Sequence, residues 1–456
     1  MGIPFDKITH MHLSGTTSAA ANGTAAVKKL IPENYKSAYR NNIVGLKAIG
    51  SYVYGDDEER DGINFPVAIT AGPAVNPAYL VGCKLTETLY VYAYDDGADG
   101  NDGNCFSVMV SAGNTCTVGA AVKFEDGGAT DPAIVRLSDT TFAVAYIDTG
   151  DTFLKCVIGT VDSTGVITYG TIKSTGVAAT ATAAAGGVGI CEPRPGVLFI
   201  AFQNVVAGGN DGSTICIPYT GTNTLGTQTS EVEFDQTAPV QIACCSYETG
   251  YAVVVYGDAG DSSYIHAWAC TVSAAGVVVF GTEKTLVSNA GTDIQVSSPQ
   301  NLNIVISYID SSSDASIVAT TITAAATPVV ATAGTVVKPF STGTHTGVRH
   351  SMIDATQGIV IGDDGTYLIA IRFSKAAAVL TADAVIDTAV EARCATETEC
   401  VCNKAGHVNI AYADAANVIQ VVDGMYFEDR IIDVRSSTAS TAYSFDVVPQ
   451  FQPEYS

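Results

Sequence analysis

The segment Ala143-Val-Ala-Tyr-Ile-Asp148 decides the fold, because it is one copy of a pattern that the chain repeats. In this pattern an apolar strand ends in a large apolar or aromatic residue, the anchor, and an acid or amide follows two positions later. The anchors recur at steps of 51 to 56 residues, and with their polar followers they are Tyr94/Asp96, Tyr146/Asp148, Phe202/Asn204, Tyr256/Asp258, Tyr308/Asp310, Ile361/Asp363 and Tyr412/Asp414. Seven copies of one supersecondary unit indicate a repeat architecture.

Each copy has room for four short antiparallel strands. In the second copy a strand that contains Pro132 near its start precedes the anchor strand, and residues 153–159 and 165–171 supply a third and a fourth strand. Proline is tolerated at the beginning of a strand, where no backbone donor is needed. Repeats of roughly fifty residues with several short strands are typical of propeller blades. The sequence therefore predicts an all-β, seven-bladed β-propeller with four antiparallel strands per blade.

The composition agrees with a large β protein. The chain has 456 residues, of which 47% are hydrophobic and only 15% charged, so it buries much apolar surface. That length exceeds the roughly 250–300 residues that one hydrophobic core usually serves, but each blade of a propeller packs only on its neighbours. No long stretch has the i, i+3, i+4 apolar spacing of a helix, and we therefore expect mostly strands.

The repeats divide the chain into three parts. We expect the propeller over residues 63–434, because the repeats and their flanking strands end there. Residues 1–62 and 435–456 are polar and poorly periodic, which is typical of extended terminal segments. We predict that the first is an N-terminal anchoring arm and the second a C-terminal arm.

Closure of the ring requires one further strand beside the last repeat. Residues 63–69 resemble the fourth strands of other repeats, and we predict that they complete the blade near residues 400–422. Residues 425–434 are the alternative closing strand. Only one of the two segments can pair beside residues 418–422, so the prediction is a choice between them.

The charge is spread unevenly along the chain. The formal net charge is −24, yet basic residues outnumber acidic ones in the first fifty positions. An acidic body lacks the cationic surface that binds phosphates, so we expect no nucleic-acid partner. A slightly basic arm fits docking onto an acidic partner, and a chance excess of basic residues is the alternative.

Neither secretion nor membrane insertion is expected. The start of the chain, Met1-Gly-Ile-Pro-Phe-Asp6, lacks the charged and apolar regions of a secretory signal. No run approaches the roughly 20 apolar residues that span a bilayer. We therefore expect synthesis and assembly in a cytoplasm. The cysteines lack regular pairing, and buried free thiols explain Cys156, Cys216 and Cys270 better than disulfides do.

The polar followers of the anchors are the first candidate site. Successive repeats would place them on one face of the propeller, where a ring of carboxylates suits Ca²⁺ or cationic groups. Asp and Asn side chains also accept bonds from nearby backbone amides and so close hairpins. Because the acid recurs in nearly every repeat, we favour the hairpin role for the whole ring: Asp96, Asp148, Asn204, Asp258, Asp310, Asp363 and Asp414.

The loop that follows the first anchor is the best candidate for a metal site. It concentrates hard oxygen ligands and glycine, as Ca²⁺ loops do, although it lacks the glutamate spacing of an EF-hand. Its candidate ligands are Asp95, Asp96, Asp99, Asn101 and Asp102. An exposed hairpin tip is the alternative interpretation of the same residues.

Catalysis finds little support in the sequence. None of the six histidines lies in a recognisable nucleophile, acid–base or phosphate-binding motif, so we predict a protein that is not an enzyme. The boxes that mark sialidase-like propellers are absent. The single tryptophan, Trp268, argues against a lectin, because sugar-binding propellers usually present an aromatic platform in each blade.

The chain resembles the Thr/Ala/Gly/Val-rich repeat propellers of tailed-bacteriophage virion proteins. The likeness rests on segments such as Ala143-Val-Ala-Tyr-Ile-Asp148 and residues 158–171, and it covers residues 63–434. It implies a structural protein of the virion, displayed on tail or capsid as a fibre or decoration and contributing to host attachment. Residues 1–62 and 435–456 would bind other virion proteins, and the chain would form a homo-oligomer within the assembly. The lack of a coiled-coil shaft argues against an elongated fibre.

Two alternatives from other functional classes stay open. The first is a carbohydrate-binding adhesin, which would hold a host glycan or surface receptor through loops on the acidic face. The second is a polysaccharide-degrading propeller, which needs two carboxylates that converge in a cleft. Paired carboxylates assemble only in the folded chain, so the sequence does not decide between these functions.

Overall fold

The computed structural model of the protein places most of the repeat region and several strands near the termini. The described residues are 11–16, 24–28, 43–48, 53–64, 70–74, 76–111, 115–179, 187–206, 209–221, 223–236, 238–299, 302–340, 345, 347–363, 367–382, 389–392, 394–402, 407–414, 417–436 and 442–449. The chain divides into two compact units. Unit 1 comprises Met1–Asn64 and Tyr426–Ser456, and unit 2 comprises Phe65–Met425.

The first three repeats of unit 2 share one plan, in which three antiparallel strands are followed by two short outer strands that pair with the third. The first repeat contains β6 (Pro77–Thr86), β7 (Leu89–Asp96), β8 (Asp102–Val110), β9 (Cys116–Val118) and β10 (Val122–Glu125). The second contains β11 (Ala129–Arg136), β12 (Thr141–Asp148), β13 (Phe153–Val161), β14 (Ile167–Tyr169) and β15 (Lys173–Ala178). The third contains β16 (Val188–Arg194), β17 (Val197–Val206), β18 (Gly209–Thr220), β19 (Thr224–Leu225) and β20 (Val232–Asp235).

The fourth and fifth repeats are joined into one sheet by a shared strand, β25 (Lys284–Ser297). Residues 284–290 of β25 pair with the fourth repeat, and residues 291–297 pair with the fifth. The fourth repeat also contains β21 (Pro239–Glu248), β22 (Tyr251–Asp258), the 3₁₀ turn η3 (Ala259–Asp261), β23 (Tyr264–Val272) and β24 (Val278–Phe280). The fifth contains β26 (Asn303–Asp310) and β27 (Ala315–Thr321).

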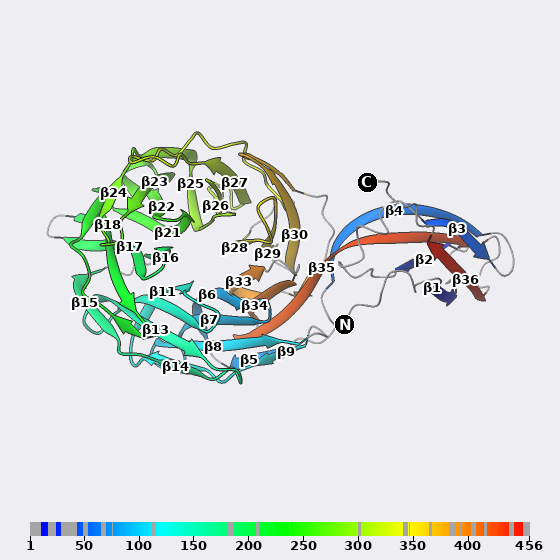
Figure 1. Cartoon of the computed structure of the whole chain (residues 1–456), viewed down its shortest axis with the longest axis horizontal. Helices are drawn as coiled ribbons and strands as arrows, with labels where there is room; N and C mark the ends of the chain where they lie inside the picture. The colour runs from blue at the N-terminus through cyan, green and yellow to red at the C-terminus, as the bar shows by residue number, and fades with distance from the viewer. Residues whose placement is uncertain are drawn as a thin grey trace. The chain divides into compact units, whose positions relative to one another are not determined.

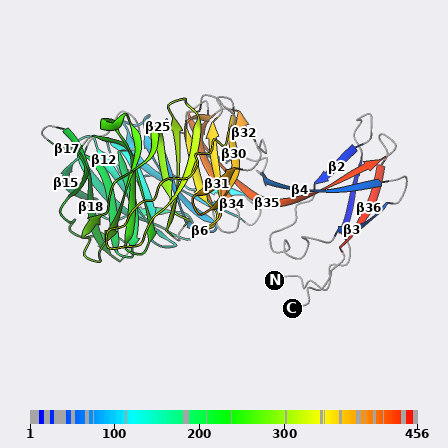
Figure 2. The ribbon, with the colours of Figure 1, turned by 90° about the horizontal axis from the view of Figure 1, so that it is seen from above.

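The last two repeats complete the set. The sixth contains β28 (Val348–Met352), β29 (Gln357–Asp363), β30 (Tyr367–Ala376), β31 (Val379–Ala382) and β32 (Ala389–Ala392). The seventh contains β33 (Cys394–Cys402), β34 (His407–Asp414), the first part of β35 (Val418–Ser436) and β5 (Thr70–Ala74). Figure 1 shows the sheets of unit 2 following one another around a ring, and Figure 2 shows their strands running between its two faces.

These pairings confirm an all-β propeller of antiparallel sheets, in which four strands follow one another and, in the first three repeats, a fifth short strand also pairs with the third. Every anchor lies in the second strand of its repeat, in β7, β12, β17, β22, β26, β29 or β34. Because β25 merges two repeats into one sheet, the number of blades does not follow from the number of sheets, and seven blades stay a prediction. Among the described residues, no helix is long and apolar enough to cross a membrane.

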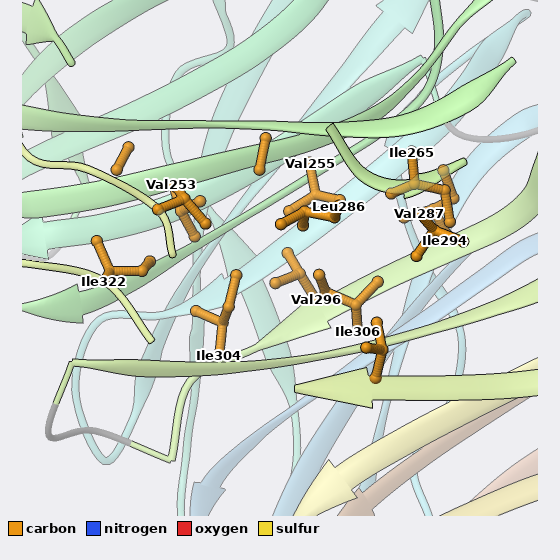
Figure 3. Close-up of a cluster of buried hydrophobic side chains, with 14 of the residues drawn as sticks. Val253, Val255, Ile265, Leu286, Val287, Ile294, Val296, Ile304, Ile306 and Ile322 are labelled. Atoms are coloured by element: carbon orange, nitrogen blue, oxygen red, sulfur yellow. The ribbon is translucent and has the colours of Figure 1, made fainter. Parts of the chain in front are cut away.

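The anchor strands are apolar throughout because each blade packs on both of its neighbours. In β22, Val254 and Tyr256 join a buried cluster with side chains of the third repeat. Val253 and Val255 face the opposite way and pack with Ile304 and other residues of the fifth repeat (Figure 3). A strand with both faces buried reads as a continuous apolar run rather than an alternating one. The predicted thiols Cys156, Cys216 and Cys270 are free and buried in these layers.

The strand that closes the seventh repeat differs from the prediction. Thr70–Ala74 pairs with the start of β35, whereas Ile63 pairs in unit 1 and residues 65–69 lie outside the described residues. Strand propensity favoured residues 63–69, since Gly72 and its following proline are depleted in strands. An edge strand tolerates both, and a Cβ on Gly72 would lie 3.1 Å from Ile419, so glycine permits the close approach.

Unit 1 brings together the two segments that we predicted as separate terminal arms, 1–62 and 435–456. The strand β36 (Ala442–Pro449) lies between β1 (Met11–Thr16) and β3 (Ile43–Ala48). The second part of β35 pairs with β2 (Thr24–Lys28) and β4 (Val53–Asn64), so the alternative closing segment 425–434 pairs here rather than beside residues 418–422. Sequence patterns missed this pairing because β4 is rich in acids and glycine, which are depleted in strands.

Candidate functional site

The acids that follow the anchors accept backbone hydrogen bonds from the turns beside them. Asp148 Oδ1 accepts from the Gly150 amide at 2.7 Å, and Asp310 Oδ1 accepts from the Ser312 amide at 2.8 Å. The same kind of bond is made by Asp96, Asp258 and Asp414. These bonds hold the loop between the second and third strands.

Two members of the predicted ring differ from the others. Asn204 on β17 donates to Glu231, the residue before β20, instead of accepting a bond from its own turn. The Asp363 side chain lies outside the described residues. The ring is therefore not a uniform set of carboxylates that face one ion.

The predicted calcium loop contains an internal cation. The ammonium of Lys123 on β10 lies against Asp102 and within 3.4 Å of Asp99. The Lys123 hydrogen bond holds the pKa of the Asp102 carboxyl below its ordinary value, although burial opposes this shift. Asp95 and Asp96 are buried in β7, and Asn101 is exposed with a left-handed backbone at φ 64°. Lysine thus neutralises part of this loop, and the calcium site stays a prediction.

The second repeat holds a lysine in a denser carboxylate cluster. Lys155 on β13 contacts Asp148 and lies 3.3 Å from Asp151 and 3.6 Å from Glu125. Glu125 also accepts the hydroxyl of Tyr146 at 2.6 Å. Burial opposes the charged ammonium, but the three carboxylates outweigh burial and raise the pKa of Lys155. The ammonium offsets part of the charge of this cluster and forms an ion pair with each of its carboxylates.

The fourth repeat contains a similar carboxylate cluster around a histidine. His266 Nδ1 lies 3.0 Å from Glu283 Oε1, and His266 Nε2 lies 3.2 Å from Asp261 Oδ2. Glu283 accepts the hydroxyl of Tyr256, whose pKa is raised by burial and by this carboxylate, so the phenol stays a donor. Asp258 supplies a further carboxylate. One of its oxygens, a ring nitrogen of His266 and a carboxylate oxygen of Glu283 all lie within 4.8 Å of one another.

The only tryptophan of the chain belongs to the same cluster. Trp268 lies on β23 two residues after His266, is half-buried, and donates from Nε1 to the Tyr256 hydroxyl at 3.2 Å. Its ring meets Phe280 edge-on, with ring centroids 5.8 Å apart. We call the following residues the His266 cluster: Tyr256, Asp258, Asp261, His266, Trp268 and Glu283.

The His266 cluster combines a buried imidazole with two solvent-exposed carboxylates. The His266 side chain is 7% exposed, whereas those of Asp261 and Glu283 are 50% and 38% exposed. Two carboxylates therefore face solvent beside a half-buried indole. Carboxylate oxygens accept hydrogen bonds from hydroxyl groups, and aromatic rings pack against apolar ligand surface. This arrangement suits a small polar ligand that has both hydroxyl groups and apolar patches.

Sequence patterns did not find the His266 cluster, since its residues come from β22, η3, β23 and the segment before β25. The register of β22 and β23 places His266 opposite Tyr256, just as Lys155 lies opposite Tyr146 in the second repeat. The hairpin of the fourth repeat is one residue longer, so His266 follows its anchor by ten residues and Lys155 follows its anchor by nine. An alignment of the third strands that allowed for this extra residue would have revealed a histidine in the position of a lysine.

Comparisons with known proteins support the fold. No protein-family model and no curated protein sequence matches the chain. The BP39L lectin of Burkholderia pseudomallei has a similar structure, with a TM-score of 0.55 at 10% identity over 77% of this chain and 98% of the lectin. The Aleuria aurantia lectin gives 0.43 at 12% identity over 69% of this chain and 98% of that one.

Enzymes that contain propellers also match. Prolyl oligopeptidase B of Galerina marginata gives a TM-score of 0.43 at 13% identity, over 74% of this chain and 48% of the enzyme. At 10% identity, the likeness to the BP39L lectin supports the propeller fold and nothing finer. These likenesses do not link the chain to virion proteins of tailed bacteriophages, so that resemblance stays a prediction from the sequence.

Proposed function

We propose that the protein is a carbohydrate-binding propeller that holds a glycan at the His266 cluster. The observation that carries this proposal is the position of Trp268: it is half-buried and donates to the Tyr256 hydroxyl, which in turn donates to the solvent-facing carboxylate of Glu283. A sugar ring presents hydroxyl donors at its edge and C–H groups on its faces. Carboxylates accept the former and an indole packs against the latter, which is how concave sites combine polar and aromatic groups.

Charge and fold support this choice over other ligands. A net charge of −24 opposes binding of nucleic acid and of other polyanions. In the first, second and fifth repeats, Lys123, Lys155 and Lys338 contact carboxylates of the corresponding loops and offset part of their charge. The His266 cluster lies on a fold shared with a bacterial lectin at a TM-score of 0.55. In the sequence, the presence of a single tryptophan argued against a lectin. The position of Trp268 beside Tyr256 in the structure favours one.

A glycan array tests the proposal, with intrinsic tryptophan fluorescence as the second readout. Because the chain has one tryptophan, a glycan that binds the His266 cluster should change the emission of Trp268 directly. We expect at least one glycan that binds saturably, changes this emission and is recovered intact by mass spectrometry. An array without a binder would contradict the proposal, and a cleaved glycan would favour the polysaccharide-degrading alternative.

A second candidate function is attachment of the propeller to a larger assembly. It is favoured by the pairing of both chain ends in unit 1, since β36 lies between β1 and β3. A variant that lacks residues 1–62 should keep the far-ultraviolet circular dichroism of a β protein but should not enter virus particles purified from host cells. Incorporation of this variant at the wild-type level would eliminate an anchoring role for these residues.

A further inference from the structure

The second and fourth repeats surround one position with the same set of groups. In each repeat a tyrosine anchor lies opposite this position, an acid ends the anchor strand and a second acid follows three residues later. The equivalent residues are Tyr146 and Tyr256, Asp148 and Asp258, and Asp151 and Asp261. A glutamate accepts the tyrosine hydroxyl in both clusters, but Glu125 ends β10 of the first repeat, whereas Glu283 precedes β25. The two clusters therefore share three positions and differ in the central group and in the strand that supplies the glutamate.

The central group is a cation in one cluster and an imidazole in the other. The ammonium of Lys155 contacts Asp148 and Asp151 of the second repeat and Glu125 of the first. In the fourth repeat His266 takes this position. Among the described ion pairs, neither Asp261 nor Glu283 meets a lysine or arginine. Ammonium carries a fixed charge near neutral pH, whereas neutral imidazole is a metal ligand. Asp261 and Glu283 thus lie beside an imidazole, whereas Asp151 and Glu125 lie beside an ammonium.

The hydrogen bonds of His266 make the same point. Both ring nitrogens lie against carboxylate oxygens, at 3.0 and 3.2 Å. A neutral imidazole donates from one nitrogen only, so its other nitrogen would direct a lone pair at an oxygen that also only accepts. A cation bound between that nitrogen and the carboxylates removes the repulsion. A protonated ring, which donates from both nitrogens, is the competing explanation.

We propose that Asp258, His266 and Glu283 bind a divalent transition-metal ion, for which Zn²⁺ is the probe. Their ligand atoms lie within 4.8 Å of one another, and this is the only such group of His, Cys, Asp or Glu side chains in the described part of the chain. One imidazole nitrogen with carboxylate oxygens favours Zn²⁺ over Ca²⁺ and Mg²⁺, which prefer oxygen ligands alone. The ion takes the place that the Lys155 ammonium fills in the second repeat.

Titration of the untagged, metal-free protein with ZnCl₂ tests this inference without any glycan. Calorimetry counts the bound ions, and the emission of Trp268 assigns one of them to the cluster, because its Nε1 lies 3.2 Å from the tyrosine that bonds Glu283. We expect saturable Zn²⁺ binding that changes the emission, and weaker binding of Ca²⁺ and Mg²⁺. A wild-type protein whose emission Zn²⁺ leaves unchanged would overturn the site in favour of a protonated His266.

Three variants complete the test. His266→Lys places an ammonium opposite Tyr256, as Lys155 lies opposite Tyr146, and is expected to fold and to lose the Zn²⁺ response. Glu283→Gln should weaken Zn²⁺ binding at least about tenfold, since even indirect ligand supports contribute that much. The control Glu233→Gln alters an exposed acid of β20 and should bind as wild type. An unchanged Zn²⁺ response in His266→Lys or Glu283→Gln would overturn the inference. Because no glycan is present, failure here leaves the proposed carbohydrate binding unaffected.

Discussion

Acidification from pH 7 to pH 4 is expected to destabilise the propeller by about 3 kcal/mol through one side chain, His350. This histidine lies on β28, where Nε2 is 2.7 Å from Ser297 Oγ and Nδ1 is 2.8 Å from Ser307 Oγ. Burial, with a smaller contribution from the charge of Arg349, lowers the pKa of His350 from 6.5 to about 3, against an opposing backbone hydrogen bond. The ring therefore stays neutral in the fold and links the fifth and sixth repeats.

The sign of the effect follows from proton uptake. An unfolded histidine binds its proton as the pH falls through 6.5, whereas folded His350 binds it only near pH 3. Between these values the unfolded state holds more protons, so the free energy of unfolding decreases as the pH falls. Above about pH 6.5 both states are neutral and this contribution is fully present.

Urea unfolding of the wild type and of His350→Gln at pH 7 and pH 4 measures this contribution. Glutamine cannot titrate, and its amide can bond one of the two serines, so the variant should be less stable at pH 7 but lose less on acidification. Carboxylates elsewhere affect both proteins equally and cancel in the comparison. Equal losses in the two proteins would show that His350 does not govern the acid sensitivity.

Glu283→Gln is expected to weaken glycan binding by about 10- to 100-fold, since a hydrogen bond to a charged group contributes about 1.5–3 kcal/mol. The substitution keeps the shape of the side chain but removes the charge that the hydroxyl donors would meet. Fluorescence titration of Trp268 with a glycan selected from the array measures the change. The same titration with and without Zn²⁺ separates a direct sugar contact from one that a metal ion mediates.

The matched control for this substitution is Glu233→Gln, an equal change at an exposed acid on β20 of the neighbouring repeat. It should bind the glycan with wild-type affinity. Similar losses in both variants would point to a general effect of surface charge, and wild-type affinity in Glu283→Gln would remove Glu283 from the glycan site.

The repeat pattern predicted the fold because packing between neighbouring blades leaves a recognisable apolar run within each single strand. Val253 to Tyr256 form an unbroken apolar run since both faces of β22 are covered, and such runs at a constant step indicate stacked sheets. Strands that depend on their partners were harder to predict. Gly72 lies in the closing strand because an edge strand accepts it, and acidic β4 is a strand because β35 pairs with it.

The candidate site was beyond sequence patterns for a related reason. Local spacing drew attention to the loop that contains Asp99 and Asp102, but Lys123, which contacts both and offsets part of their charge, comes from a strand about twenty residues later. His266 and Glu283 have no motif spacing, and only strand register brings them together. Charge density along the sequence therefore marked a loop that already holds a lysine, whereas the cluster around His266 was visible only in the fold.

The most direct test of the proposed function is a crystal structure of the protein with the glycan selected from the array. We predict a sugar whose hydroxyl groups contact Glu283 and Asp261 and whose ring lies against the exposed side of Trp268. A glycan bound in another repeat, at the loop of residues 95–104 or on unit 1, with the His266 cluster left unchanged, would contradict the proposal.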